Sequence, residues 1–269
     1  MLAVAGVGYL LAAGRVRGGW SRKRSASFIA GLVVVATALL SGIDTYADYL
    51  LSVHMVEHML LMTVAPVLLV CGAPVRLALA ASRSRGRRAI AMLLHQRVVA
   101  LATRPAFGVT LLCAVMLGTY LTGLFELSLR SQTVHALEHA AFFWSGVLCF
   151  APLIAADPFP RPPSALLRFA WLMVVMTAMV VVGALLSFDS SVRYAPYLEP
   201  ARAMHVSALA DQQLAGVVMW FGGGLFGAVL MLVLVTQTLF AEERRQRRRE
   251  RYASDRAAPG STAERAFIA

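Results

Sequence analysis

Long apolar segments recur along the chain and are separated by short polar or basic segments. Most of them are near the roughly 20 residues that an α-helix needs to cross the hydrocarbon core of a bilayer. The pattern predicts seven transmembrane helices, at residues 1–13, 27–49, 52–73, 105–126, 134–155, 166–188 and 208–240. The expected fold is therefore all-α, a polytopic membrane bundle of about seven helices.

Two of these segments depart from the usual length. Segment 1–13 is short, but no basic region precedes it and no small-residue cleavage pattern follows, so we expect a retained helix rather than a signal peptide. Segment 208–240 exceeds the bilayer thickness and is expected to tilt or to project beyond it. The chain thus divides into a seven-helix transmembrane domain, 1–240, and a basic cytoplasmic tail, 241–269, expected to be largely disordered.

Basic residues predict the orientation. Of the 25 lysines and arginines, all but Arg130, Arg193 and Arg202 lie in the segments that follow the first, third, fifth and seventh predicted helices. This asymmetry predicts an outside N-terminus and a cytoplasmic C-terminus in a bacterial plasma membrane. It also accounts for the net charge of +11 without a nucleic-acid partner. The arginines beside the helices are expected to meet membrane lipid instead.

Composition narrows the class further. Hydrophobic residues make up 59% of the chain and charged residues only 14%, which excludes an ordinary soluble domain. The three cysteines, Cys71, Cys113 and Cys149, form no C-x-x-C motif. We therefore expect neither a disulfide framework nor a thiolate metal site.

Paired histidines are the main candidates for chemistry. His54 and His58 open the third predicted helix in H-M-V-E-H, and His135 and His139 open the fifth in H-A-L-E-H. Residues i and i+4 share a helix face and lie about 6 Å apart along the axis. Because both helices run inward, the two pairs are expected at the same depth on the outer side. Four imidazoles there could bind one zinc, copper, iron or nickel ion.

Other polar and sulfur-containing residues could support such a site. Glu57 and Glu138 each follow the first histidine of a pair by three residues. Each could orient an imidazole, bind metal, or simply meet water at the interface. Asp211, at the start of the seventh predicted helix, could hydrogen-bond an imidazole or cap its own helix. Thioethers near the outer mouth suit Cu(I), although methionine also packs well in membrane helices. The supporting candidates are Glu57, Glu138, Asp211, Gln212, His205, Met55 and Met204.

The pattern H-x-x-E-H also occurs in inverzincin metalloproteases. A hydrolytic zinc needs one such motif and an open coordination position, whereas this chain has two copies. The duplication therefore argues against a protease, and we do not expect an enzyme.

Three stretches together resemble the CtaG family of cytochrome c oxidase assembly factors, in the branch associated with caa3-type oxidases. They are H-M-V-E-H-M-L-L-M-T-V-A-P-V-L-L-V-C-G-A-P, H-A-L-E-H-A-A-F-F-W-S-G and D-Q-Q-L-A-G-V-V-M-W, within a similar layout over roughly residues 1–240. The resemblance implies an integral membrane protein that helps to mature a haem-copper oxidase and takes part in its copper supply. By motif position it implies His54, His58, His135 and His139 as ligands, with Asp211 and Gln212 beside them.

The expected function is therefore a membrane assembly factor that holds copper at the outer face and passes it to a subunit of cytochrome c oxidase. The first alternative is a haem-binding or redox membrane protein that uses the paired histidines as axial ligands. A second alternative, a copper transporter, would need polar residues that continue through the membrane, and few lie below the outer turn.

Overall fold

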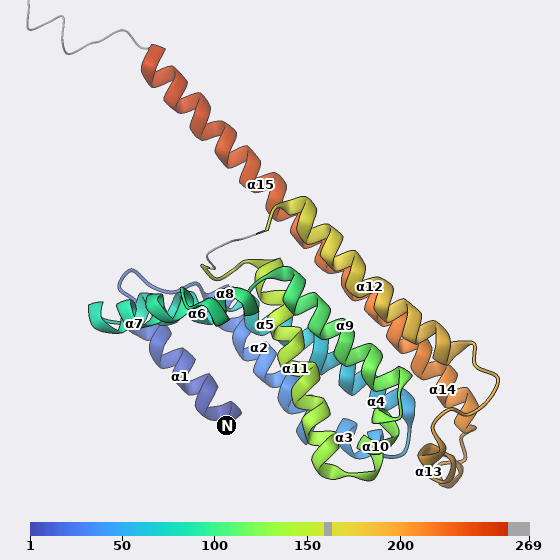
Figure 1. The fold of residues 1–269 in the computed structure, drawn as a ribbon. Helices are drawn as coiled ribbons and strands as arrows, with labels where there is room; N and C mark the ends of the chain where they lie inside the picture. Colours follow the sequence, from blue (N-terminus) through green and yellow to red (C-terminus); the bar gives the residue numbers. More distant parts are fainter. Residues whose placement is uncertain (159–162, 258–269) are drawn as a thin grey trace, which may run out of the picture. The chain divides into compact units, whose positions relative to one another are not determined.

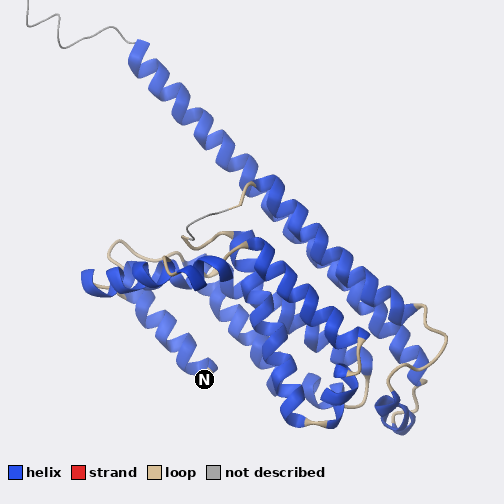
Figure 2. Cartoon of the chain, in the orientation of Figure 1, coloured by secondary structure: helices blue, strands red, loops and turns tan. Residues whose placement is uncertain are grey.

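All regular structure in the described part of the chain is helical. The computed structural model describes residues 1–158 and 163–257, and within these ranges every regular element is a helix (Figure 2). The prediction of an all-α fold is confirmed. The chain divides into two compact units, Met1–Gly227 and Ala228–Ala269. The candidate site described below lies entirely within the first unit.

The first half of the chain forms ten helical elements, and Figure 1 shows how the labelled helices are arranged. They are α1 (Leu2–Gly14), α2 (Arg22–Leu40), α3 (Gly42–Ala47), α4 (Leu51–Met59), the π-helical turn η1 (Leu60–Val64), α5 (Ala65–Cys71), α6 (Pro74–Ala81), α7 (Ser84–Leu94), α8 (Arg97–Ala102) and α9 (Pro105–Leu121).

The second half forms eight more within the described residues. They are α10 (Leu124–Arg130), α11 (Gln132–Ile154), α12 (Ala165–Ser187), the 3-10 turn η2 (Ala195–Tyr197), α13 (Leu198–Ala203), α14 (Ala208–Val217), the π-helical turn η3 (Val218–Gly222) and α15 (Gly223–Ala257).

Within residues 1–158 and 163–257, five helical segments are long and apolar enough to cross a membrane. They are Arg22–Leu40, Leu51–Ala81, Gln132–Ile154, Ala165–Ser187 and Ala208–Glu250. Helices α9 and α10, bent by 73° at their junction, supply a sixth if the pair counts as one span. Helix α1 is apolar but has 13 residues, or about 20 Å of helix. The protein is thus a membrane helix bundle, while the count of seven and the orientation stay predictions.

Helix boundaries differ from the sequence-based ranges at two breaks. The predicted helix 27–49 ends early, because Ser41 is extended and its hydroxyl accepts the Ile43 N–H to begin α3. Helix 105–126 is broken by the extended Thr122. The predicted end of helix 52–73 coincides with a third break, where Ala73 adopts a left-handed conformation (φ 51°) and Pro74 begins α6. Proline is tolerated at this first helix position, because its missing N–H would have no intrahelical partner.

The basic segment between α5 and α9 is itself helical, although the apolar pattern of the sequence predicted no helix there. Helices α6, α7 and α8 lie across one end of the first unit (Figure 1). Helix α7 buries none of its side chains and combines arginines with exposed apolar residues such as Met92 and Leu93. Such an amphipathic pattern belongs to a helix that lies along a membrane surface rather than across it.

The last helix extends beyond the predicted end of the membrane domain. Helix α15 continues to Ala257, and residues 258–269 lie outside the described residues. The expected boundary between residues 240 and 241, and disorder at the end of the tail, therefore stay predictions.

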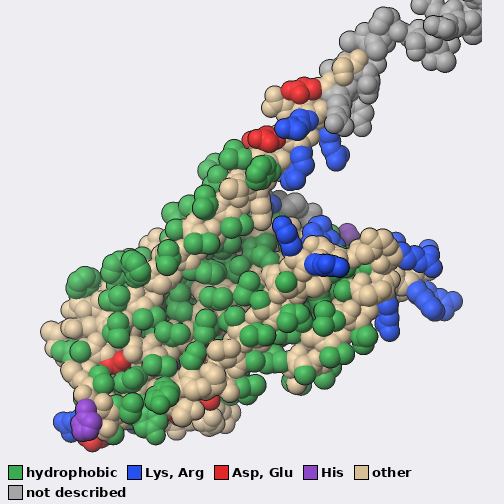
Figure 3. Space-filling model, turned by 180° about the vertical axis from the view of Figure 1, so that it is seen from behind, with side chains coloured by type: hydrophobic (Ala, Val, Ile, Leu, Met, Phe, Trp, Pro, Cys, Tyr) green, Lys and Arg blue, Asp and Glu red, His purple; other side chains and the backbone are tan. Residues whose placement is uncertain are grey.

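Within the first unit, α11 is the central helix. It packs against α9, α5 and η1, while α5 also packs against α2, and α14 packs against α12 and α4. A small apolar core of Val35, Ala38, Leu61 and Ala65 joins α2 to the α4–η1–α5 segment. Large apolar side chains remain exposed on the outer faces, and Figure 3 shows them covering the flank of this unit. Such a surface suits lipid rather than water.

A close approach sets the distance between α11 and the helix that carries the first histidine pair. A Cβ on Gly146 would lie 2.3 Å from the Met62 carbonyl oxygen and 2.9 Å from Pro66 Cγ. Pro66 has no N–H, so the ordinary α-helical bond to the Met62 carbonyl cannot form, and the helix widens into the π-helical turn at this point. Glycine at position 146 lets the backbone of α11 rest against that carbonyl.

We predict that Gly146→Ala destabilises the protein by about 1–3 kcal/mol, because the added methyl group meets backbone rather than a flexible side chain. Thermal unfolding in detergent would measure the change. Gly118→Ala is the matched control. Gly118 lies in α9, another helix of the same unit, and a Cβ there would meet nothing within 4 Å. Equal midpoints for the two variants would contradict the close contact.

The predicted orientation has a separate test. A reporter fused after Ala269 should be active only in the cytoplasm, and one placed after Arg130, between α10 and α11, only outside. Reversed activities would overturn the orientation and would move the histidine pairs to the cytoplasmic side.

Candidate metal centre

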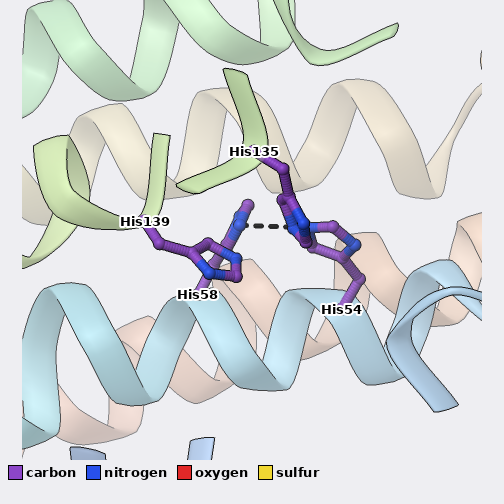
Figure 4. A group of neighbouring side chains, drawn as sticks. All are labelled: His54, His58, His135 and His139. Atoms are coloured by element: carbon purple, nitrogen blue, oxygen red, sulfur yellow. Dashed lines mark hydrogen bonds between the residues drawn. The ribbon is translucent and has the colours of Figure 1, made fainter. Parts of the chain in front are cut away.

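Four histidines from two helices converge at one point of the first unit. His54 and His58 project from α4, and His135 and His139 from α11, with their imidazoles turned toward one another (Figure 4). One nitrogen of each ring can be chosen so that all four lie within 4.8 Å of one another. The i,i+4 spacing places each pair on one helix face, and the packing of α11 against η1 brings the faces together.

The four rings differ in their access to solvent. His54 and His58 are fully buried, and His139 is nearly so, whereas His135 is half-buried. Helices α3, α10 and α13 lie at the same end of the unit, where α4, α11 and α14 begin (Figure 1). His135 is thus the most accessible of the four rings.

Two tyrosine hydroxyls lie within hydrogen-bond distance of the Nδ1 atoms of the two histidines of α4. The Tyr197 hydroxyl lies 2.8 Å from His54 Nδ1, and the Tyr120 hydroxyl lies 2.6 Å from His58 Nδ1. The Nε2 atoms of His54 and His58, on the opposite sides of the rings, lie 3.0 Å apart and face the centre of the cluster. Burial raises the pKa of Tyr197 well above its ordinary value, so this phenol keeps its proton.

The other two histidines and both glutamates have unsatisfied polar atoms. His135 Nε2, His139 Nε2 and all four carboxylate oxygens of Glu57 and Glu138 have no hydrogen-bond partner among the described residues. Glu57 Oε1 approaches His139 Nε2 at 3.7 Å, which is too long for a hydrogen bond. Buried polar atoms without partners are unfavourable. A cation among these donors would satisfy them, so the residues present fit a metal ion.

Asp211 lies against the backbone of α4 rather than against an imidazole. Its carboxylate accepts hydrogen bonds from the Leu51 N–H at 2.6 Å, from the Ser52 N–H at 3.3 Å and from the Ser52 hydroxyl. A carboxylate at a helix N-terminus satisfies free N–H groups and meets the positive end of the helix dipole. Asp211 thus caps the helix that carries His54 and His58, from a position 160 residues away in sequence.

Gln212 anchors the segment between α12 and α14. Its side-chain oxygen accepts the Arg193 N–H at 2.7 Å, and its nitrogen donates to the Ser191 carbonyl at 3.0 Å. The same segment is held further along, where the Tyr194 hydroxyl donates to the Tyr120 carbonyl at 3.0 Å. These contacts fix the segment that carries Tyr197.

The remaining candidates lie apart from the four-histidine group or within the packing of α4. Met204 and His205 are exposed at the end of α13, where His205 adopts a left-handed backbone conformation (φ 57°). Met55 is fully buried in the same turn of α4 as His54. The structure therefore brings together the four histidines and Glu57, and leaves Met204 and His205 on the surface.

Tyr120 and Tyr197 are the residues that the sequence reading missed. They contact histidines that lie 62 and 143 residues away in sequence. Tyrosine is also common at membrane interfaces without a functional role, because its ring is amphipathic. No local motif marks either residue, so only the folded arrangement identifies them.

Comparison with known proteins places the chain in a family. A family profile described as "Cytochrome c oxidase caa3 assembly factor (Caa3_CtaG)" matches residues 7–240. Uncharacterized proteins of Mycobacterium leprae (strain TN) and Mycobacterium tuberculosis (strain CDC 1551 / Oshkosh) are 30% and 32% identical to the chain over 261 residues. Those alignments cover 93% of this chain and 40% of each relative.

The chain therefore spans less than half the length of these relatives. No solved structure gives a significant match. The profile covers the segments of all four cluster histidines, from α1 into α15, and confirms the resemblance carried by the two H-x-x-E-H motifs and by D-Q-Q-L-A-G-V-V-M-W. The chain belongs to the Caa3_CtaG family of cytochrome c oxidase assembly factors.

Proposed function

We propose that the protein binds a copper ion through His54, His58, His135 and His139 at the outer face of the plasma membrane and aids its delivery to subunits of a nascent cytochrome c oxidase. The observation that carries the proposal is the convergence of four imidazole nitrogens within 4.8 Å. Membership of an oxidase assembly family supports the partner, because haem-copper oxidases need copper to mature.

The donor set favours a transition-metal ion. Metal–imidazole bonds are about 2.0–2.1 Å long, so donors within 4.8 Å of one another need only small side-chain rotations to share an ion. Neutral imidazole suits copper as well as zinc, iron and nickel. The choice of copper comes from the family's link to a copper oxidase.

The geometry favours an ion over a haem. A haem would need an open slot as wide as its macrocycle between two axial imidazoles. Here the two pairs face each other directly, and the ring centroids of His58 and His139 are 5.2 Å apart. Phe142 packs on His58 at 4.7 Å and Phe125 meets His54 at 5.2 Å. The space beside the rings is filled by aromatic side chains.

Delivery rather than catalysis agrees with the family and with the surroundings of the site. Both glutamates beside the histidines are buried, and one histidine reaches the surface. An ion can therefore enter and leave through a single side while the buried carboxylates compensate its charge. This arrangement suits a carrier that holds an ion until a partner takes it.

Metal binding by the purified protein is the first test. We predict that the wild type binds one Cu⁺ or Ag⁺ per chain, and that His58→Ala with His139→Ala lowers the affinity at least tenfold, about 1.4 kcal/mol, because half of the imidazoles are lost. His205→Ala is the control, since His205 is exposed outside the cluster. Equal affinity of the double variant and the wild type would exclude these histidines as the binding site.

Oxidase maturation is the second test. In cells, the same double variant should reach the membrane at the wild-type level but lower oxidase activity, because helices in a bilayer persist through their apolar length and internal hydrogen bonds. Added copper should partly restore activity by mass action. Normal oxidase activity at low copper, with the variant present at the normal level, would exclude a role of these histidines in copper delivery.

A further inference from the structure

A continuous chain of hydrogen bonds links the segment between α12 and α14 to the histidine cluster. It runs from the Ala47 carbonyl to the Tyr197 hydroxyl (3.0 Å) and from that hydroxyl to His54 Nδ1 (2.8 Å). It continues from His54 Nε2 to His58 Nε2 (3.0 Å) and ends where His58 Nδ1 meets the Tyr120 hydroxyl (2.6 Å). Every side chain in it is buried.

The first bond fixes the direction of the others. A carbonyl oxygen can only accept, so Tyr197 must use its single proton to donate to Ala47. The same hydroxyl can then only accept from His54, which requires the proton of a neutral His54 to be on Nδ1. His54 Nε2 consequently carries a lone pair that faces the centre of the cluster.

We infer that Tyr197 is a positioning residue that holds His54 in the Nδ1–H tautomer and so presents its Nε2 lone pair to a metal ion. The segment that bears Tyr197 thereby becomes part of the centre, although it contributes no ligand. Partners that set the tautomer and orientation of a ligating imidazole strengthen metal binding at many sites. The metal-binding part of this inference rests on the proposed function, whereas the tautomer does not.

Tyr120 has a different role at the other end of the chain of bonds. Because His54 Nε2 accepts, a neutral His58 must donate from Nε2, and its Nδ1 must accept from the Tyr120 hydroxyl. His58 can ligate through Nε2 only when its single proton is on Nδ1. The Tyr120 hydroxyl then has to rotate from donor to acceptor. His54 is therefore prepared for an ion in advance, while His58 joins after this exchange.

The backbone around Tyr197 is anchored independently of the histidines. Gln212 holds the Arg193 N–H and the Ser191 carbonyl, and Tyr194 donates to the Tyr120 carbonyl. Removing only the Tyr197 hydroxyl should thus leave the segment in place. Tyr194 provides a matched comparison, because it is equally buried, belongs to the same segment and bonds a backbone carbonyl without contacting an imidazole. In Tyr194→Phe, both Gln212 hydrogen bonds still hold this segment.

The tautomer can be measured without any metal. We predict that ¹⁵N spectra of histidine-labelled, metal-free protein place the proton of His54 on Nδ1, with the signal assigned by its loss in His54→Gln. In Tyr197→Phe, the Nε2–H form of His54 should become more populated, because Nδ1 loses the phenol oxygen that accepts its proton. Tyr194→Phe should leave the signal unchanged. A wild-type His54 protonated on Nε2 would overturn the inference whether or not the protein binds copper.

Metal titration gives the second readout. With Ag⁺ as the probe, Tyr197→Phe should weaken binding about 10–100-fold, the range found for partners of metal-ligating histidines, and Tyr194→Phe should stay within twofold of the wild type. If the wild type binds Ag⁺, and Tyr197→Phe and Tyr194→Phe both bind it with the wild-type affinity, the positioning role fails and the proposed function survives. If the wild type binds no Ag⁺, the proposed function fails, and the tautomer measurement decides the inference.

Discussion

The contact between α11 and the turn η1 determines where the two histidine pairs lie relative to each other. Pro66 removes the donor that would bond the Met62 carbonyl, and Gly146 lets the backbone of α11 approach that carbonyl to a distance that no side chain would permit. The histidines lie one to three turns away on the same two helices. A separation set deep in the apolar bundle is therefore transmitted along stiff helices to the end where α4 and α11 begin, where it becomes the spacing of the four imidazoles.

The membrane environment explains why the polar residues form one connected system. Water cannot satisfy polar groups inside a bilayer, so they need partners within the protein. Asp211 satisfies the first N–H groups of α4, Tyr197 and Tyr120 take up the Nδ1 atoms of His54 and His58, and Gln212 satisfies backbone groups of the segment before α14. Among the described residues, the buried side-chain atoms that remain without partners are on His135, His139, Glu57 and Glu138. The unsatisfied part of the network therefore coincides with the place where an ion would bind.

The sequence predicted the helices and the convergence of the histidines because both depend on local periodicity. Apolar length identifies a span, and an i,i+4 pair at the start of two parallel helices defines a common face and depth. The breaks at Ser41 and Thr122 were missed because apolar residues continue on both sides of each. Tyr197 was missed because its partner, His54, is 143 residues away. For Asp211 the sequence offered an imidazole partner or a cap of its own helix, whereas the carboxylate bonds the start of α4, a contact that depends on how two distant helices pack.

Differences among the four histidines bear on how a carrier could both hold and release an ion. His54 is locked by a phenol that cannot reverse its role, because Tyr197 is committed to the Ala47 carbonyl. His58 is bonded to a phenol that can turn, and His135 is the most accessible of the four. Under the proposed function, ligation would thus change stepwise, with His54 retaining the ion while His135 gives way to an incoming donor. Strong retention and ready transfer usually conflict, since tighter ligation slows release. Under the proposed function, ligands of unequal freedom would reduce that conflict, because a locked ligand provides affinity and a mobile one provides a path for exchange.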